Sequence, residues 1–136
     1  LIDSIILSQS CDLVNGKIEI VLVCPYYPLK TFLERLGEQA ESKRSKKDII
    51  EKIKGGTQPG YHLLNKSASI GFLSDYQIVD FKNVYGIQFS VLTEMVGKTK
   101  DRVRLLPPYR EHLSQSFARY FMRVGLPQDI IVEGYY

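Results

Sequence analysis

The 136-residue chain has no long hydrophobic run, few cysteines and little excess charge. None of its apolar stretches approaches the roughly 18 residues that a membrane-spanning helix needs, which excludes an integral helical membrane protein. Only two cysteines are present, Cys11 and Cys24, so a disulfide-rich secreted scaffold is excluded as well. The net charge of +3 is too small to indicate a nucleic-acid-binding protein by itself.

The overall composition is that of a globular domain, with 44% hydrophobic and 24% charged residues. The first residues form no secretory signal, because their apolar run is short and no basic residue precedes it. We therefore predict a cytoplasmic protein whose two thiols are reduced rather than joined in a disulfide. The chain starts within an expected strand and without methionine, so we expect a single domain over residues 1–136 that lacks an N-terminal strand.

Two strands are predicted near the start of the chain. Residues 5–7 are continuously apolar and predict a buried strand. Asn15-Gly16 is the strongest hairpin signal in the chain and predicts a tight turn before a second strand at residues 18–24. Pro25 and Pro28 are expected to end that strand, because proline has no backbone N–H to donate.

A helical insertion is predicted at residues 31–55. Thr31 with Glu34 three residues later matches a capping box, which marks a helix start. The basic run at 43–47 is expected to be a solvated linker between two helical pieces. Gly55-Gly56 is expected to end the second piece.

Further segments complete the predicted fold. Residues 61–64 and 76–81 predict strands, and residues 65–74 between them predict a polar loop or lid. Residues 89–96 predict a short helix. These patterns indicate an α+β fold, built on a small, bent antiparallel sheet or an SH3-like β-barrel that the helical insertion interrupts.

The strongest helix pattern lies near the C-terminus, at residues 108–124. Pro107 and Pro108 mark its start, and Gly125 and Pro127 mark its end. The helix is amphipathic and is expected to pack on the sheet. Its apolar stripe consists of Leu113, Phe117, Tyr120, Phe121 and Val124.

The first predicted strands resemble a known arrangement. An apolar strand at residues 5–7 is followed by Ser8, a polar loop with Asn15-Gly16, and a strand at residues 21–25 that ends in proline. This order is similar to the centre of the PemK/MazF-type endoribonuclease toxins. The resemblance implies an SH3-like barrel.

A later part of the chain extends this resemblance and also departs from it. The strand at residues 76–80 and the helix at 89–96 are similar to that family's last strand and terminal helix. The family has Thr or Ser two positions after the proline, where this chain has Tyr27. Its key arginine lies in a loop upstream of the first matched strand, which this chain does not contain. The resemblance therefore implies the barrel and does not carry over the ribonuclease activity.

The densest polar cluster lies directly after the first strand. One hypothesis is a nucleophile or ligand loop, in which Cys11 or a serine acts beside the Asp12 carboxylate. An acid next to the thiol opposes thiolate formation, which needs a nearby cation or a helix N-terminus. The same residues satisfy backbone donors in a structural turn, and this interpretation is favoured. The cluster consists of Ser8, Gln9, Ser10, Cys11 and Asp12.

The cysteines and histidines do not form a recognisable metal site. Cys11, Cys24, His62 and His112 lack the close spacing of structural zinc ligands, so we predict no metal and no cofactor. The same residues offer a Cys–His or Ser–His–Asp set with His62 or His112 as the base. No nucleophile-elbow or phosphate-loop pattern accompanies them.

Basic residues gather on and just before the C-terminal helix. Residues 98–124 contain seven basic and two acidic residues. Opposite the apolar stripe, the helical spacing predicts one polar face with arginines suited to bidentate phosphate contacts. The simpler interpretation is a solvated face whose arginines pair with glutamates and pack their stems on the sheet. The predicted binding residues are Arg102, Arg104, Arg110, His112, Arg119 and Arg123.

We predict from these features a bacterial module that binds RNA, DNA or a nucleotide phosphate through the basic face at 98–124. One alternative is an endoribonuclease of the PemK/MazF type. Another is a non-catalytic adaptor that binds a protein partner or forms a homodimer. The sequence favours a protein that is not an enzyme and that has no membrane partner.

Overall fold

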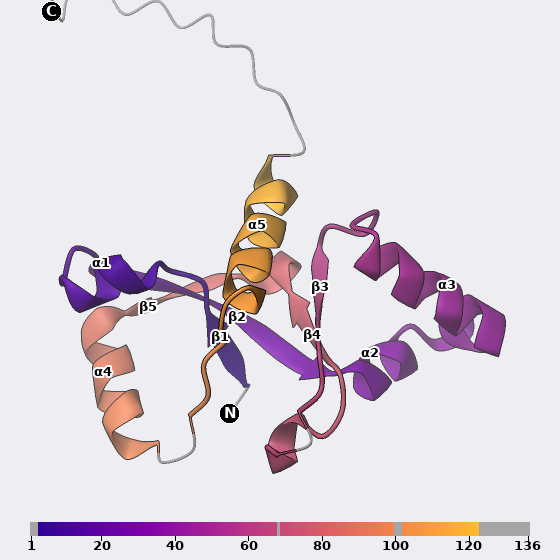
Figure 1. Ribbon diagram of the computed structural model, residues 1–136, viewed down its shortest axis with the longest axis horizontal. Coiled ribbons are helices and arrows are strands. Elements are labelled where there is room, and N and C mark those ends of the chain that lie inside the picture. The colour runs from indigo at the N-terminus through magenta and orange to yellow at the C-terminus, as the bar shows by residue number, and fades with distance from the viewer. Residues whose placement is uncertain (1–2, 68, 100–101, 123–136) are drawn as a thin grey trace, which may run out of the picture.

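The computed structural model describes residues 3–67, 69–99 and 102–122, and these form an α+β fold (Figure 1). The α+β class and the antiparallel sheet agree with the prediction from the sequence. Helices cover both faces of this sheet. The sheet is open, so the bent-sheet alternative describes it and no closed barrel is required. The strands are β1 (Ser4–Ile6), β2 (Ile20–Pro28), β3 (Tyr61–Leu64), β4 (Gln77–Asp80) and β5 (Tyr85–Gln88). The helices are α1 (Ser10–Val14), α2 (Leu29–Arg35), α3 (Lys43–Lys54), α4 (Phe89–Lys98) and α5 (Tyr109–Phe121).

The long strand β2 organises the sheet. It pairs with β1 along one edge, and it pairs in succession with β5 and β4, while β3 pairs with β4. A turn at Phe81–Asn83 separates β4 from β5. Across this turn the register shifts by three residues: Tyr26 and Val23 are three positions apart, but their partners Val79 and Tyr85 are six apart.

The expectation that Pro25 and Pro28 end the second strand is wrong, since β2 includes both. The carbonyl oxygen of Leu22 and the N–H of Tyr26 form hydrogen bonds with the β1 segment. Backbone groups of successive strand residues point to opposite edges, so the nitrogen of Pro25 points away from β1. At that edge the turn at Phe81–Asn83 interrupts the ladder, and no hydrogen bond is lost there. Pro28 is the last residue of the strand.

The predicted hairpin turn at Asn15-Gly16 is also wrong. The polar segment before it forms the short helix α1, and the Asn15 side chain donates to the backbone oxygen of Cys11 at its end. Gly16 follows with a φ of +60°, a left-handed conformation that glycine adopts without strain. A two-residue turn does not fit here because of the strand register. Ile5 pairs with Cys24, so the two strands are joined by a long connection that contains α1.

The helical insertion is confirmed, but its start and its middle differ from the prediction. α2 begins at Leu29, so Thr31 lies within the helix and does not cap it. The capping box belongs to α3, where Ser42 and Ser45 bond to each other's backbone N–H. The basic run at 43–47 is therefore the first part of α3 and not a linker. Gly55 ends α3 as expected.

Two hydrophobic clusters lie on opposite faces of the sheet. Ile78 of β4 packs with Phe32 and Ile53 under the helical insertion. The next residue, Val79, packs on the other face with Leu113 of α5. Successive side chains of a strand point to opposite faces, so β4 is buried on both sides.

The C-terminal helix is confirmed where the structure describes it, with Pro108 as its N-cap residue. Leu113 is buried. The ring of Phe117 packs against the ring of Phe81, with their centroids 5.5 Å apart. Phe121 departs from the prediction, because 61% of it is exposed. Its ring packs on the rings of Phe117 and Tyr120 of the same helix instead of the sheet. The last predicted stripe residue, Val124, lies outside the described residues.

The helix predicted at 89–96 is confirmed as α4, which continues to Lys98. Among the described residues, none of the helices combines the length and the apolar character needed to cross a bilayer.

Candidate functional site

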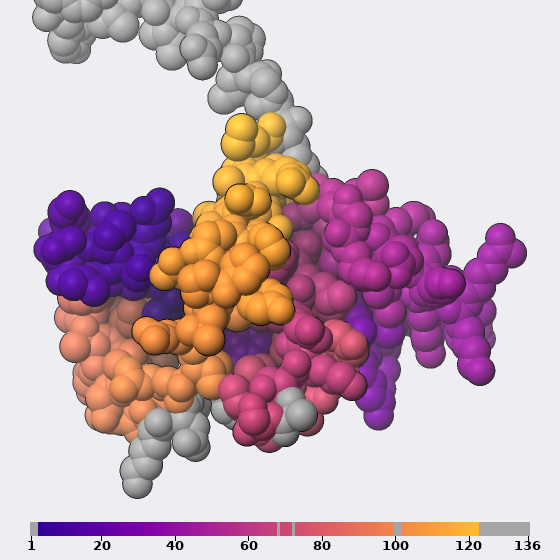
Figure 2. Space-filling model, viewed as in Figure 1, coloured from indigo at the N-terminus to yellow at the C-terminus, as the bar shows by residue number. Residues whose placement is uncertain are grey.

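A groove of about 430 Å³ lies between α5, the edge strand β3 and the end of α3. In Figure 2 the orange helix α5 and the magenta segment from α3 to β3 lie side by side on the viewed face. The volume falls within the range of about 300–1,000 Å³ that is typical of small-molecule sites. The polar side chains that line the groove belong to Lys54, Tyr61, His62, His112, Gln115, Ser116 and Arg119.

The register of β3 decides which of its side chains faces α5. His62 pairs with Val79, and cross-strand partners share a face of the sheet, so His62 lies on the α5 side. Its imidazole stacks on the ring of Phe81, with the centroids 6.3 Å apart. Leu63 pairs with Ile78 and lies on the other face, with the insertion cluster.

The helical repeat of α5 decides which of its residues reach the groove. His112, Ser116 and Arg119 are spaced by four and three residues, so they lie on one helix face beside the buried Leu113. All three line the groove. The structure therefore brings together these members of the predicted basic face.

The groove is electropositive. Its lining includes Lys54 and Arg119, and no Asp or Glu from the described part of the chain lines it. The Lys54 ammonium lies 2.9 Å from the Glu51 carboxylate, but both side chains are more than half exposed and such a pair stabilises little. Arg119 makes no ion pair within residues 3–67, 69–99 and 102–122. It is the cation most available to a bound anion.

The charge of His112 influences the ionisation of His62 across the groove. Burial, and then the charge of His112, lower the pKa of His62 to about 4. His62 is therefore neutral near pH 7. No hydrogen bond to either imidazole is made by the residues that the structure describes.

A glycine allows Arg119 to approach the end of α3. Gly56 has a φ of +74°, and a Cβ atom placed on it would lie 3.0 Å from Nη1 of Arg119. A side chain at this position would displace the guanidinium from the loop. Gly56 thus contributes both the backbone turn after α3 and the space for Arg119.

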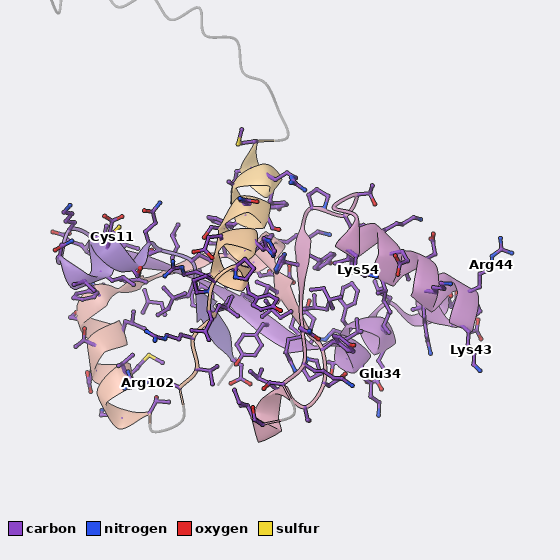
Figure 3. All side chains as sticks on the ribbon, in the orientation of Figure 1. Cys11, Glu34, Lys43, Arg44, Lys54 and Arg102 are labelled. Atoms are coloured by element: carbon purple, nitrogen blue, oxygen red, sulfur yellow. The ribbon has the colours of Figure 1, made fainter. Side chains whose placement is uncertain are left out.

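The other predicted basic residues lie outside the groove. Arg110 is paired with Glu111, with Nη2 and Oε1 2.7 Å apart, and this pairing lowers the pKa of the glutamate. Arg102 and Arg104 are exposed in the segment between α4 and α5, and Figure 3 shows Arg102 on the α4 side of the molecule. Arg123 lies outside the described residues.

The polar cluster at residues 8–12 is separate from this groove, because α1 and α3 lie on opposite sides of α5 (Figures 1 and 3). The hydroxyl of Ser8 accepts a hydrogen bond from the backbone N–H of Leu22 at 2.9 Å, which ties the segment to β2. The Cys11 thiol is exposed, and its contacts are with Gln9 and Asp12. The segment forms a short helix rather than the expected turn. Ser10 is the first residue of that helix.

Two features of the site were not predicted. The sequence singled out His62 and His112 as bases, but it did not indicate that they meet, because fifty positions separate them. Lys54 was one of many lysines in the insertion and had no distinguishing signal. Groups of three or more residues able to hold a metal ion are absent from the described parts of the chain.

Comparisons with protein-family models, with curated proteins and with solved structures find no match to this chain.

Proposed function

We propose that the groove binds a phosphate-bearing ligand, either a nucleic acid or a nucleotide. The observation that supports this most is the guanidinium of Arg119 in a groove that Lys54 also lines. Among the described residues, Arg119 has no ion-pair partner and no carboxylate lines the groove. A guanidinium donates two parallel hydrogen bonds to a phosphate group, which makes arginine the usual residue for phosphate recognition.

The simpler interpretation, a solvated helix face, applies to one side of α5. It requires arginines that pair with glutamates, and Arg110 with Glu111 meets that requirement. Arg119 does not, because it faces the groove and makes no ion pair in the described part of the chain. The two arginines of one helix therefore favour different roles.

Fluorescence polarisation tests the proposal with a short single-stranded oligonucleotide that carries a 5′-phosphate and a 3′-fluorophore. We expect binding at low salt, and we expect Arg119→Glu to weaken it at least tenfold, since the change removes a phosphate contact and adds repulsion. Arg44→Glu is the matched control, because Arg44 lies at the far end of α3 from the groove (Figure 3). Absence of binding, or equal effects of the two substitutions, would contradict the proposal.

A second candidate function is cleavage of RNA in the same groove. The observation that favours it is the pair of imidazoles, one of which is neutral near pH 7. In such a reaction His62 would take the proton of a ribose 2′-hydroxyl as it attacks the phosphorus. His112 in its protonated form would give a proton to the departing 5′-oxygen. The products would be a 2′,3′-cyclic phosphate and a 5′-hydroxyl.

A labelled RNA and the DNA of the same sequence distinguish this candidate from binding alone. The reaction predicts fragments from RNA only, because DNA lacks the 2′-hydroxyl. His62→Gln and His112→Gln are each expected to abolish the fragments while Arg44→Glu leaves them unchanged. Intact RNA after prolonged incubation, or fragments that persist in both histidine variants, would exclude this activity at the groove.

A further inference from the structure

We infer that the ligand of the groove is a terminal phosphate monoester, either a free nucleotide or the phosphorylated end of a strand, and not the internal backbone of a nucleic acid. This inference rests on the proposed phosphate-binding function and specifies its substrate class. It is incompatible with the cleavage candidate, which needs an internal diester in the same groove. It follows from where the cations lie, from the aromatic residues of the groove and from its titratable groups.

Two basic side chains, of Lys54 and Arg119, line a single groove instead of a continuous row along the surface. The two histidines line the same groove. The remaining candidates lie elsewhere. Arg110 is on the opposite side of α5 from Arg119, nine residues earlier. Arg102 lies on the α4 side, and Lys43 and Arg44 lie at the far end of α3 (Figure 3). A protein that follows a nucleic-acid backbone needs a continuous row of phosphate contacts.

The aromatic lining of the groove is already engaged in other contacts. The Lys82 ammonium lies over the ring of Tyr61, 4.6 Å from its centroid. The rings of Tyr61 and Phe32 make an edge-to-face contact, with their centroids 4.9 Å apart. The imidazole of His62 is stacked on Phe81. Proteins that bind single strands without sequence preference stack successive bases on open aromatic rings, whereas Tyr61 and His62 each already have a neighbour against the ring. We therefore expect the groove to recognise the phosphate group of its ligand and not a row of bases.

The titratable groups suit a doubly charged anion. A phosphate monoester loses its second proton at a pKa near 6, so it carries almost two negative charges at pH 7, whereas an internal diester carries one. The Arg119 guanidinium and the Lys54 ammonium line the groove. Lys54 also pairs with Glu51, but that contact is exposed and weak enough for a phosphate to compete with it. His112 also lines the groove, so its imidazole N–H is available to donate a hydrogen bond to the anion.

The test compares strands of one sequence that differ only at the 5′ end, and it follows their polarisation with a 3′-fluorophore. We expect the phosphorylated strand to bind at least tenfold more tightly than the strand with a 5′-hydroxyl. Adenosine monophosphate should displace it, and adenosine should not. Competition by inorganic phosphate as well would indicate that the phosphate group alone is recognised, which also supports the inference.

Salt dependence gives an independent readout. A ligand held by one terminal phosphate should lose less than about tenfold in affinity between 50 and 200 mM salt, against about 10³–10⁵-fold for a protein that makes six to ten backbone contacts. Arg119→Gln should abolish the preference for the phosphorylated end, and Arg102→Gln should preserve it.

The outcomes separate the two proposals. Equal binding of both strands with the Arg119 dependence intact would overturn the monoester inference and leave phosphate binding in place. Absence of binding by either strand and by the nucleotide would overturn both. A preference for the phosphorylated end that Arg119→Gln does not change would locate the monoester site elsewhere and would overturn the inference for this groove.

Discussion

The hydroxyl of Tyr27 donates a hydrogen bond to Oδ2 of Asp80 over 3.1 Å, and this contact joins the end of β2 to the end of β4. The Asp80 carboxylate is buried and also accepts from the side chain of Asn83 and from the backbone N–H of Lys82. It therefore holds the turn that places Phe81 beneath α5, where His62 stacks on it. A buried carboxylate thus supports one wall of the groove.

Asp80→Ala should lower the free energy of unfolding by about 2–4 kcal/mol, because three donors lose their acceptor in a buried place. Tyr27→Phe removes a single donor and should lower it by about 1 kcal/mol. Urea unfolding followed by circular dichroism measures both. Asp48→Ala is the control, since its ion pair with Lys52 is exposed and stabilises little. An effect of Asp80→Ala no larger than that of the control would refute this role.

Two apolar residues of α5 should differ sharply in their contribution to stability. Leu113→Ala creates a cavity between the helix and the sheet and should cost about 2–5 kcal/mol. Phe121→Ala removes a ring that is 61% exposed and, among the described residues, packs on rings of its own helix, so we expect a much smaller loss. Thermal and urea denaturation compare the two variants. Similar losses would mean that Phe121 is packed against the protein.

The stability of the protein should depend on the ionisation of His62. The folded pKa of about 4 lies below the ordinary value of 6.5, so the unfolded chain binds this proton more readily. The contribution of His62 to stability is therefore full above pH 6.5 and is lost as the pH falls towards 4. Between pH 7 and pH 5 the loss should be about 2 kcal/mol.

Urea unfolding at these two pH values measures that loss. His62→Gln should remove it, whereas His112→Gln should retain most of it, since burial is the larger cause of the shift. The comparison uses the difference between the two pH values within each variant, which cancels any uniform destabilisation. An identical pH dependence in the unchanged protein and His62→Gln would show that His62 does not titrate abnormally.

The two cysteines should react at very different rates. Cys11 is exposed, whereas Cys24 is fully buried and its thiol donates to the backbone oxygen of Asp80 at 2.8 Å. Burial raises the pKa of Cys24 to about 12, so almost no thiolate forms at pH 8. Dithiobisnitrobenzoate should label one thiol in the folded protein and the second only after unfolding.

Cys11→Ser should eliminate the rapid reaction and Cys24→Ser should leave it unchanged. Two thiols that react together in the folded protein would mean that the core around Cys24 opens readily.

Local patterns in the sequence predicted the elements whose cause is local. The amphipathic repeat and Pro108 place α5, and Gly55 ends α3, because these signals act within one or two turns of the chain. The alternation around β4 predicted a strand, but Ile78 and Val79 are both buried, since helices cover both faces. The α+β class followed from such patterns.

The site was predictable only in part. His112, Ser116 and Arg119 share a helix face that their spacing reveals. The same spacing places Arg110 on the opposite side of the helix, nine residues before Arg119. What spacing does not reveal is tertiary: the Arg119 side of α5 meets β3 and the end of α3 to form a groove.

The sequence by itself determined the amphipathic helices, the helical insertion and the absence of membrane-length apolar runs, since each depends on neighbouring residues. Only the tertiary structure decided that β2 continues through Pro25, because the turn at Phe81–Asn83 interrupts the ladder on the side that its nitrogen faces. Only the tertiary structure brought His62 of β3 to the same groove as His112 of α5. Contacts between residues far apart in the chain depend on strand register and helix docking, and the packing of the whole fold sets both.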